Sequence, residues 1–304
     1  MGAPLDAAHA GQLTPIDELP IHPGLSWLRD LPAGREWLAR LPRIVERCAS
    51  RWALELGEPY PNAFVSLVMP ATRSDGSEAV LKIQFPHRES EHEAAALEAW
   101  AGDGAARLLE HDPERSALLI ERCTPGTPLS ELGPDRALDV AIGLLPRLWR
   151  PVTTPFRPLA EEAAWWASYL PEDWERAGRP FAQELLDAAR DAIAAVSGSQ
   201  GEQVLVNQDM HAANVLRAER EPWLVIDPKP LAGEREFGVA SLVRGSELGE
   251  DRNDVLHRLD RLTAELGLDR ERARSWCLAQ TLAWAFDEGD VLDRNVRVAR
   301  WLAG

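Results

Sequence analysis

The order of the predicted secondary structure limits the fold of this chain more than any other feature. Strand-like segments dominate the first 121 residues, whereas helical periodicity dominates from residue 134 onward. The chain lacks the regular alternation of strand and helix that a doubly wound sheet needs, and no G-x-G-x-x-G motif follows a strand. We therefore predict an α+β chain with a small strand-rich lobe followed by a larger helical lobe.

Short apolar segments bounded by turn residues predict the strands. They fall in an early group, 64–69, 78–84, 107–110 and 117–121, and a late group, 203–206, 214–218 and 223–226. Asp75-Gly76 lies between the first two segments and is a turn dipeptide typical of a hairpin. The last two segments of the late group predict a second, smaller hairpin inside the helical part.

Helical periodicity predicts the remaining elements. The expected helices cover 38–56, 90–100 with Ser90 as the N-cap, 134–149, 159–174, 180–196 and stretches of 251–303 broken at Gly267 and Gly289. These elements divide the chain into an N-terminal lobe at 1–121 with an irregular segment at 1–35, a connector at 122–127, and a helical C-terminal lobe at 128–304.

The chain is acidic, with 33 Lys and Arg against 49 Asp and Glu and a net charge of -16. It has no basic cluster, which argues against a nucleic-acid partner. It has no apolar run long enough for a membrane span and no signal-peptide pattern at its start. Its three cysteines lack the spacing of a metal site and fit a reducing, cytoplasmic compartment. The acidity could attract cationic small molecules or serve only solubility.

Three polar residues around the late strands carry the chemistry. Asp209 and Asn214 are five residues apart in a predicted loop, and Asp227 follows the apolar segment 223–226. A carboxylate at the end of a buried strand is costly unless it binds something. Phosphoryl transfer from ATP needs an Asp that accepts the proton of the attacking hydroxyl, and an Asn and a second Asp that hold Mg²⁺. The spacing therefore predicts a kinase.

A second pair of residues lies upstream. Lys82 interrupts the apolar strand at 78–84, where a lysine needs a partner, and Glu93 in the following helix can supply it. A strand lysine that pairs with a helix glutamate and reaches the ATP phosphates is the arrangement of kinases.

Four motifs together resemble the aminoglycoside phosphotransferase family within the protein-kinase-like fold, and most closely its streptomycin and hydroxyurea resistance branch. They are the V-L-K-I strand, the E-x-x-A-L-x-x-W helix, the D-x-H-x-x-N-V-L loop and the P-W-L-x-I-D-P-K strand, and the resemblance covers roughly residues 35–304. It implies an ATP- and Mg²⁺-dependent kinase that phosphorylates a hydroxyl of a polar or cationic antibiotic.

The resemblance also assigns roles to single residues. It makes Asp209 the catalytic base and Asn214 and Asp227 the Mg²⁺ ligands. It makes Lys82 the phosphate-binding lysine with Glu93 as its ion-pair partner. The end of the segment 117–123, which includes Glu121 and Cys123, becomes the hinge whose backbone binds adenine. We further expect a monomer or weak dimer without nucleic-acid or membrane partners.

The chain departs from the family pattern in three places. Asn207-Gln208 stands where His-Gly is usual, the predicted phosphate-covering loop at 59–66 lacks glycine, and Gly238-Val239-Ala240 replaces an Asp-Leu-Ala that anchors the catalytic loop. These departures leave open a nucleotide-binding pseudokinase with a regulatory role. A kinase of the same fold that acts on a metabolite, such as an amino sugar or amino alcohol, is the other alternative.

Candidate substrate residues remain open to two interpretations. His211 could hold the catalytic loop through hydrogen bonds or contact the substrate. Asp287 and Glu288 in a late acidic segment, and Glu236 behind the metal-binding strand, could bind a cationic acceptor. Solvent exposure of a helix end would also explain the acidic segment.

Overall fold

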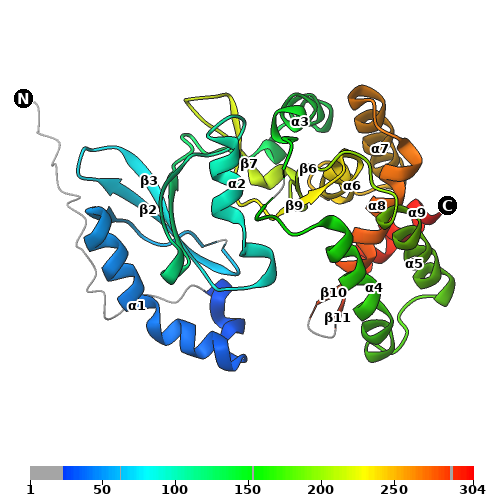
Figure 1. Ribbon diagram of the computed structural model, residues 1–304, viewed down its shortest axis with the longest axis horizontal. Coiled ribbons are helices and arrows are strands. Elements are labelled where there is room, and N and C mark those ends of the chain that lie inside the picture. The colour runs from blue at the N-terminus through cyan, green and yellow to red at the C-terminus, as the bar shows by residue number, and fades with distance from the viewer. Residues whose placement is uncertain (1–22, 62, 153, 288–289) are drawn as a thin grey trace, which may run out of the picture. The chain divides into compact units, whose positions relative to one another are not determined.

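A computed structural model describes residues 23–61, 63–152, 154–287 and 290–304 (Figure 1). The chain divides into two compact units. Residues 23–86 and 110–120 form the first unit, and residues 87–109 and 121–304 form the second. The lobe boundaries predicted from the sequence stay a prediction. The units differ from them in that residues 87–109 group with the helical part.

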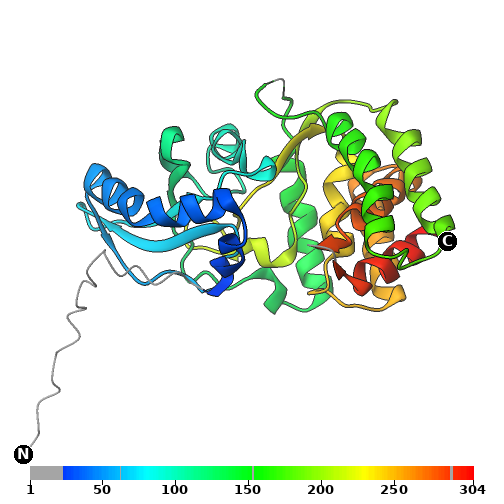
Figure 2. The ribbon, with the colours of Figure 1, turned by 90° about the horizontal axis from the view of Figure 1, so that it is seen from below.

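The first unit contains a helix and a five-stranded sheet, of which only Leu108, Leu109 and Glu121 at the strand ends belong to the second unit. Helix α1 (Pro32–Trp52) follows a 3₁₀ turn (Pro23–Arg29) and lies beside β2 and β3 (Figure 2). The strands are β1 (Leu54–Leu56), β2 (Ser66–Arg73), β3 (Glu78–Gln84), β4 (Leu108–Asp112) and β5 (Ala117–Glu121), in the order β1-β2-β3-β5-β4. The Trp37 indole of α1 donates a hydrogen bond to the Gln84 carbonyl at the end of β3.

The hairpin predicted from Asp75-Gly76 is confirmed. Strands β2 and β3 pair antiparallel, and the register sets Lys82 opposite Val68. Gly76 has a φ of 82°, a conformation that a side chain would strain. The Asp75 carboxylate accepts hydrogen bonds from the backbone and the hydroxyl of Ser77, which fixes the turn.

Two helix predictions need correction at their ends. Helix α1 begins at Pro32, not at residue 38, because the first position of a helix needs no N–H donor and tolerates proline. The irregular segment predicted at 1–35 is therefore wrong for residues 32–35, and β1 occupies the end of the helix predicted at 38–56. Helix α2 (Glu93–Trp100) begins three residues after Ser90, which instead ends a 3₁₀ turn.

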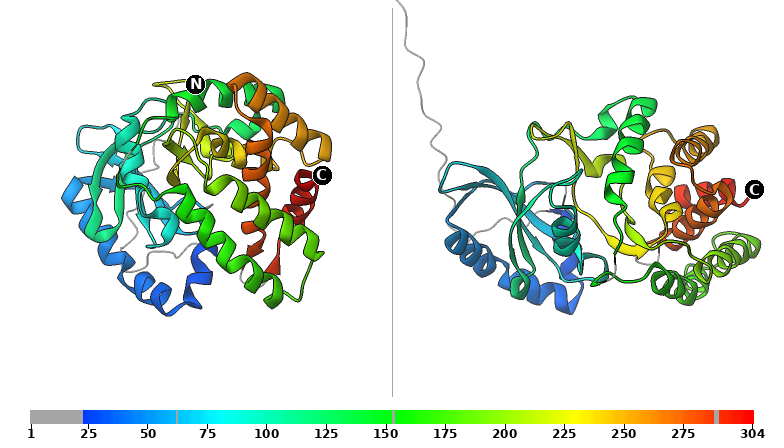
Figure 3. Two further views of the ribbon diagram at one scale, coloured as in Figure 1. Left: turned by 45° about the vertical axis from the view of Figure 1, so that its right-hand side comes forward. Right: turned by 45° about the horizontal axis from the view of Figure 1, so that its top comes forward.

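The second unit is mainly a helical bundle, and Figure 3 shows its helices gathered together. Besides α2, they are α3 (Pro134–Leu148), α4 (Leu159–Arg176), α5 (Gln183–Ser197), α6 (Ala240–Arg244), α7 (Arg252–Leu266), α8 (Arg270–Ala283) and α9 (Asp293–Ala303). Helix α8 is the core, since it packs against α4, α5, α6, α7 and α9 and buries most of its residues. None of the described helices is long and apolar enough to cross a membrane.

Two antiparallel strand pairs inside this unit position the polar residues. Strand β6 (Val204–Asn207) pairs with β9 (Pro230–Gly233), and β7 (Val215–Arg217) pairs with β8 (Trp223–Val225). The predicted late hairpin is confirmed as β7 and β8. Strand β9 was not expected from its sequence, and neither was the short pair β10 (Phe286–Asp287) and β11 (Asp290–Val291) within the helical region 251–303.

Candidate active site

The loop that carries Asp209 starts at the buried end of β6. The side-chain oxygen of Asn207 accepts hydrogen bonds from the backbone nitrogens of Asp209 and Lys229, both at 3.0 Å. One buried amide thus joins the start of the loop to the residue before β9. The asparagine found in place of the usual histidine therefore still fixes backbone groups, as its chemistry allows.

A residue of α8 supplies a second anchor for the loop. The Gln280 side-chain nitrogen donates a 2.8 Å hydrogen bond to the Gln208 carbonyl, and Gln280 is fully buried. Gly238, where the family usually has aspartate, lies so close to Trp149 that a Cβ atom would stand 2.6 Å from the indole nitrogen. Gln280 and Gln208 are 72 positions apart in the sequence, and no sequence motif predicts their contact.

Asn214 and Asp227 are brought together by the β7–β8 hairpin. The backbone nitrogen of Ile226 donates to the Asn214 carbonyl at 2.9 Å, so Asn214 lies opposite the residue before Asp227. The Asn214 side-chain nitrogen donates to the Asp209 carbonyl at 3.1 Å, which leaves its oxygen as the atom suited to a magnesium ion. Asp227 has a φ of 49°, a strained conformation often found at functional sites.

Lys229 connects the loop to residues far away in the sequence. Its ammonium nitrogen lies 3.1 Å from Asp209 Oδ2 and 2.9 Å from Glu89 Oε2. Burial lowers the pKa of Lys229, but the charges of Asp209, Glu89 and Asp227 raise it more, and the net pKa is above its ordinary value. Lys229 is therefore a permanent cation beside the predicted base.

A tryptophan completes the surroundings of Asp209. The Trp284 ring centroid lies 5.1 Å from the Lys229 ammonium and 4.4 Å from the Arg244 guanidinium carbon. Arg244 Nη2 lies 3.9 Å from Asp209 Oδ1, beyond hydrogen-bond distance. Two cations thus face one aromatic ring and one carboxylate, an arrangement that ion–quadrupole attraction stabilises.

His211 forms a close pair with Glu247. Its Nδ1 atom lies 2.6 Å from the Glu247 carboxylate. Burial lowers the pKa of His211, but Glu247 and Asp209 raise it more, and the net pKa lies above its ordinary value. Burial raises the pKa of Glu247, whereas the bond to His211 lowers it further, to about 2. The contact favours the interpretation in which His211 holds the loop.

The predicted hinge residues have identifiable contacts. The Glu121 carboxylate accepts hydrogen bonds from Arg220 at 2.7 and 2.9 Å and from the backbone nitrogen of Arg107. Cys123 is half-buried, and burial raises the pKa of its thiol to about 11. The adenine-binding roles of Glu121 and Cys123 stay predictions.

The other predicted site residues are not linked to the residues around Asp209 by any contact described above. Lys82 is buried on β3 of the first unit and Glu93 is buried at the start of α2 in the second, so their ion pair stays a prediction. Glu236 accepts a 3.4 Å bond from the backbone nitrogen of Asp269, which caps α8. Glu288 lies outside the described residues, and of Asp287 only the backbone is described.

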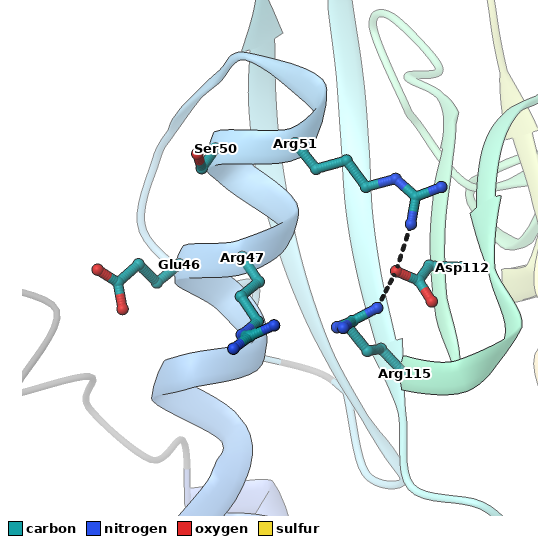
Figure 4. Close-up of a pocket in the computed structure, with 6 residues that line it drawn as sticks. All are labelled: Glu46, Arg47, Ser50, Arg51, Asp112 and Arg115. Atoms are coloured by element: carbon teal, nitrogen blue, oxygen red, sulfur yellow. Dashed lines mark hydrogen bonds and ion pairs between the residues drawn. The ribbon is translucent and has the colours of Figure 1, made fainter.

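A surface hollow of about 470 Å³ lies in the first unit and shares no residue with the site around Asp209. It is lined by Glu46, Arg47, Ser50, Arg51, Asp112 and Arg115. Figure 4 shows Arg51 of α1 and Arg115 both directed at Asp112, at 3.0 and 2.7 Å, while Glu46 points away. Because two of its three arginines, Arg51 and Arg115, are already paired with Asp112, we regard the hollow as a structural cluster.

Comparison with known proteins decides the family. Residues 51–289 match the family model described as aminoglycoside/hydroxyurea antibiotic resistance kinase. The chain belongs to this kinase family. It is 42% identical over 283 residues to a hydroxyurea phosphotransferase of Kitasatospora aureofaciens, with 90% of this chain and 82% of the relative covered. It is 40% identical to a streptomycin 6-kinase of Streptomyces griseus, with 89% and 92% covered.

A solved structure confirms the fold. The choline kinase LicA of Streptococcus pneumoniae matches with a TM-score of 0.61 at 12% identity, over 87% of this chain and 99% of the other. The predicted α+β, protein-kinase-like fold is therefore confirmed. Membership in a kinase family makes this chain an ATP-using phosphotransferase, which agrees with the prediction from Asp209, Asn214 and Asp227.

Proposed function

We propose that this family member transfers the γ-phosphate of MgATP to a hydroxyl of a streptomycin-like antibiotic and so confers resistance. The observation that carries the proposal is the Asp209 loop. It is fixed by Asn207 and Gln280, it hydrogen-bonds Asn214, and its carboxylate lies beside a permanent cation. We also propose a cytoplasmic protein that is a monomer or weak dimer.

The proposed chemistry uses Asp209 as the general base. The acceptor hydroxyl gives its proton to Asp209 while its oxygen forms a bond to the γ-phosphorus, and ADP leaves with the electron pair of the broken P–O bond. Lys82 would bind the nucleotide phosphates, and Glu93 would orient the Lys82 side chain as its ion-pair partner, as the family resemblance implies. No covalent enzyme intermediate is required, because positioning and charge stabilisation supply most of the catalysis.

The magnesium ion fits the residues at the hairpin. The Asn214 carbonyl is bonded to the backbone of the residue before Asp227, its side-chain nitrogen is bonded to the loop, and its amide oxygen is thus the atom suited to the ion. Mg²⁺ accepts two protein oxygens because it keeps several waters. Within the described residues, no group of three or more His, Cys, Asp or Glu side chains could hold a metal. When bound, the ion would neutralise the phosphate charge that develops during transfer.

The anchored loop supports an enzyme over a pseudokinase. The departures at Asn207-Gln208 and at Gly238 removed the usual anchors, yet Asn207 and Gln280 hold the same loop by other hydrogen bonds. The predicted base and both predicted metal ligands stand in this loop and the hairpin beside it. Nucleotide binding without ATP turnover in the presence of any candidate acceptor would instead support the regulatory alternative.

The acceptor can be identified by mass spectrometry. The relatives' names give two different acceptors, streptomycin and hydroxyurea. Purified protein with MgATP should add one phosphoryl group to a streptomycin-type antibiotic in a panel that also contains hydroxyurea, amino sugars and amino alcohols. Transfer to hydroxyurea alone, or to a metabolite alone, would contradict the antibiotic assignment made here.

The charge of the acceptor has its own test. If a cationic acceptor is drawn by acidic side chains such as Asp287, Glu288 and Glu236, its KM should rise with salt, because screening shortens to about 8 Å at physiological ionic strength. Replacing Asp287 and Glu288 together by amides should flatten this dependence. A KM that is insensitive to salt in the wild type would assign the acidity to solubility.

A further inference from the structure

Lysine is almost absent from this chain. Of 33 basic residues, 31 are arginine, and the two lysines are Lys82 and Lys229. Arginine makes structural ion pairs throughout the second unit, as in Arg220 with Glu121, Arg88 with Glu162 and Arg261 with Asp139. A chain with this preference keeps lysine where a guanidinium would not serve. One of the two positions is the predicted phosphate-binding lysine, and the other has no assigned role.

The backbone of Lys229 is fixed on both sides. Its nitrogen donates to the Asn207 side chain at 3.0 Å, and its carbonyl accepts from the Gln208 nitrogen at 3.0 Å. The position lies two residues after Asp227 and immediately before β9. Any movement of the ammonium must therefore come from the four rotatable bonds of the side chain.

The Lys229 ammonium binds one carboxylate oxygen of Asp209 and does not contact the other. Its contact is with Oδ2 at 3.1 Å, while the cation that faces Oδ1 among the described residues is Arg244, whose nitrogen is more distant at 3.9 Å. A guanidinium at this position would favour a bidentate contact and occupy both carboxylate oxygens. A lysine therefore orients Asp209 through one oxygen and leaves the other for an acceptor hydroxyl.

We propose that Lys229 is a second catalytic residue, whose ammonium contacts an oxygen of the phosphoryl group during its transfer. The inference rests on the proposed function. The oxygen of an acceptor hydroxyl bound to Asp209 would lie about 2.7 Å from the carboxylate oxygen. The phosphorus that this hydroxyl attacks would lie about 3–3.5 Å from the hydroxyl oxygen. The Lys229 side chain, which is already bonded to the same carboxylate, is long enough to reach the phosphoryl oxygens.

The step keeps Lys229 protonated throughout. The proton of the acceptor goes to Asp209, the new O–P bond forms, and the bond to ADP breaks with its electron pair on ADP. Lys229 turns from Glu89 toward the phosphoryl oxygens, where negative charge accumulates, and returns when the product leaves. Its contribution is electrostatic, as for a preorganised donor that acts on developing charge.

Three variants test the proposal in one assay. Lys229→Arg keeps the charge and the ion pairs, Lys229→Met keeps the length alone, and Arg261→Met removes a cation with several carboxylate partners elsewhere in the same unit. We expect both Lys229 variants to lose about 10²–10³-fold in kcat, with KM values for MgATP and acceptor close to wild type. Arg261→Met should keep the wild-type kcat.

Two readouts separate catalysis from a structural role. Thermal unfolding shows whether Lys229→Arg is folded, and the ratio of rates with MgATP and MgATPγS reports contact with the phosphoryl oxygens. We expect a wild-type unfolding temperature for Lys229→Arg and a changed rate ratio in both Lys229 variants. If Lys229→Arg retains more than about a third of the wild-type kcat with an unchanged ratio, Lys229 is only a clamp for Asp209 and Glu89.

The wild type in the same assay separates the two proposals. If it phosphorylates no acceptor, the proposed function fails. The Lys229 inference is then judged on the slow hydrolysis of MgATP, in which water replaces the acceptor. The same loss in both Lys229 variants would support it, and wild-type hydrolysis in both, or none in any protein, would overturn it.

Discussion

Two aspartates of this molecule are held by cations in different ways. Asp112 in the first unit is contacted by two arginines, Arg51 and Arg115, and its side chain is 3% exposed. Asp209 in the second unit is within hydrogen-bond distance of one lysine, has the Arg244 guanidinium 3.9 Å away, and is 14% exposed. Burial raises the pKa of Asp112, but the hydrogen bond and charge of Arg115 and the charge of Arg51 lower it further, and the net pKa lies below its ordinary value.

The difference teaches how to tell a structural carboxylate from a reactive one. Arg51 and Arg115 both contact Oδ2 of Asp112 and join α1 to the end of β4, so the charge of Asp112 serves stability. Asp209 has the Lys229 ammonium at Oδ2, while Arg244 lies 3.9 Å from Oδ1, beyond hydrogen-bond distance, so Oδ1 is the atom that we assign to the acceptor hydroxyl. The type of cation within hydrogen-bond distance and the exposure of the carboxylate distinguish the two sites, although both are acidic residues in largely buried positions.

Changing Asp209 should have the largest effect. We expect Asp209→Asn to lower kcat by about 10²–10⁴-fold, because the amide cannot accept the acceptor's proton. Nucleotide affinity and the free energy of unfolding should stay near wild type. Steady-state kinetics at saturating acceptor measure the effect, with MgADP titration as the control. Retention of more than about a tenth of the activity would mean that Asp209 is not the base.

The metal ligands beside Asp209 should matter for nucleotide binding. We expect Asp227→Ala to weaken MgADP binding by at least about tenfold, since even residues behind a metal's direct ligands change its affinity about 10–100-fold. Asn214→Ala should have a smaller effect, because a carboxylate is a stronger Mg²⁺ ligand than an amide. Isothermal titration calorimetry measures both. Wild-type affinity in both variants would remove the metal assignment.

Changing Asp112 should affect stability and leave transfer intact. Asp112→Asn keeps the shape but loses the charge that faces Arg51 and Arg115, and we expect a loss of about 1–3 kcal/mol in the free energy of unfolding. The loss stays modest because the Arg51 side chain is 59% exposed and can turn to water. Urea unfolding measures it. Unchanged stability would show that the Arg–Asp cluster contributes nothing.

The smallest expected effect concerns the pH dependence of the His211–Glu247 pair. Because the pKa of His211 is raised on folding, its contribution is fully present below the ordinary pKa of 6.5 and is lost as pH rises through the raised value. Glu247, with a pKa of about 2, contributes above its ordinary 4.5 and loses this contribution as pH falls toward 2. His211→Gln should flatten the stability change above pH 6.5, by about 1 kcal/mol.

Unfolding curves at several pH values in wild type and His211→Gln measure this effect. Glu247→Gln is the matched variant and should remove the same dependence above pH 6.5. If neither variant changes the profile while acceptor KM rises, His211 contacts the substrate instead of holding the loop.

The sequence predicted what local pattern determines. The β2–β3 hairpin follows from Asp75-Gly76, and the late hairpin follows from its apolar segments. The start of α1 at Pro32 and strand β9 were missed. The start is missed because proline usually ends helical periodicity, and β9 because a Pro-Leu-Ala-Gly segment becomes a strand only through pairing with β6.

In the candidate site, too, the sequence predicted local features but not long-range contacts. Asp209, Asn214 and Asp227 stand in one short segment and could be predicted together from their spacing. The contacts of Gln280 with Gln208 and of Glu247 with His211 span 72 and 36 residues, and ordinary polar residues make them. Tertiary packing brings these distant segments together, so no residue pattern could announce the contacts.

The most direct test compares the two aspartates in one assay. Phosphoryl transfer from MgATP to streptomycin would be measured by mass spectrometry for Asp112→Asn and Asp209→Asn, at a temperature where both variants are folded. We expect Asp112→Asn to transfer at close to the wild-type rate and to exceed Asp209→Asn by about 10²-fold or more. Equal rates in the two variants, or a faster rate in Asp209→Asn, would contradict this expectation.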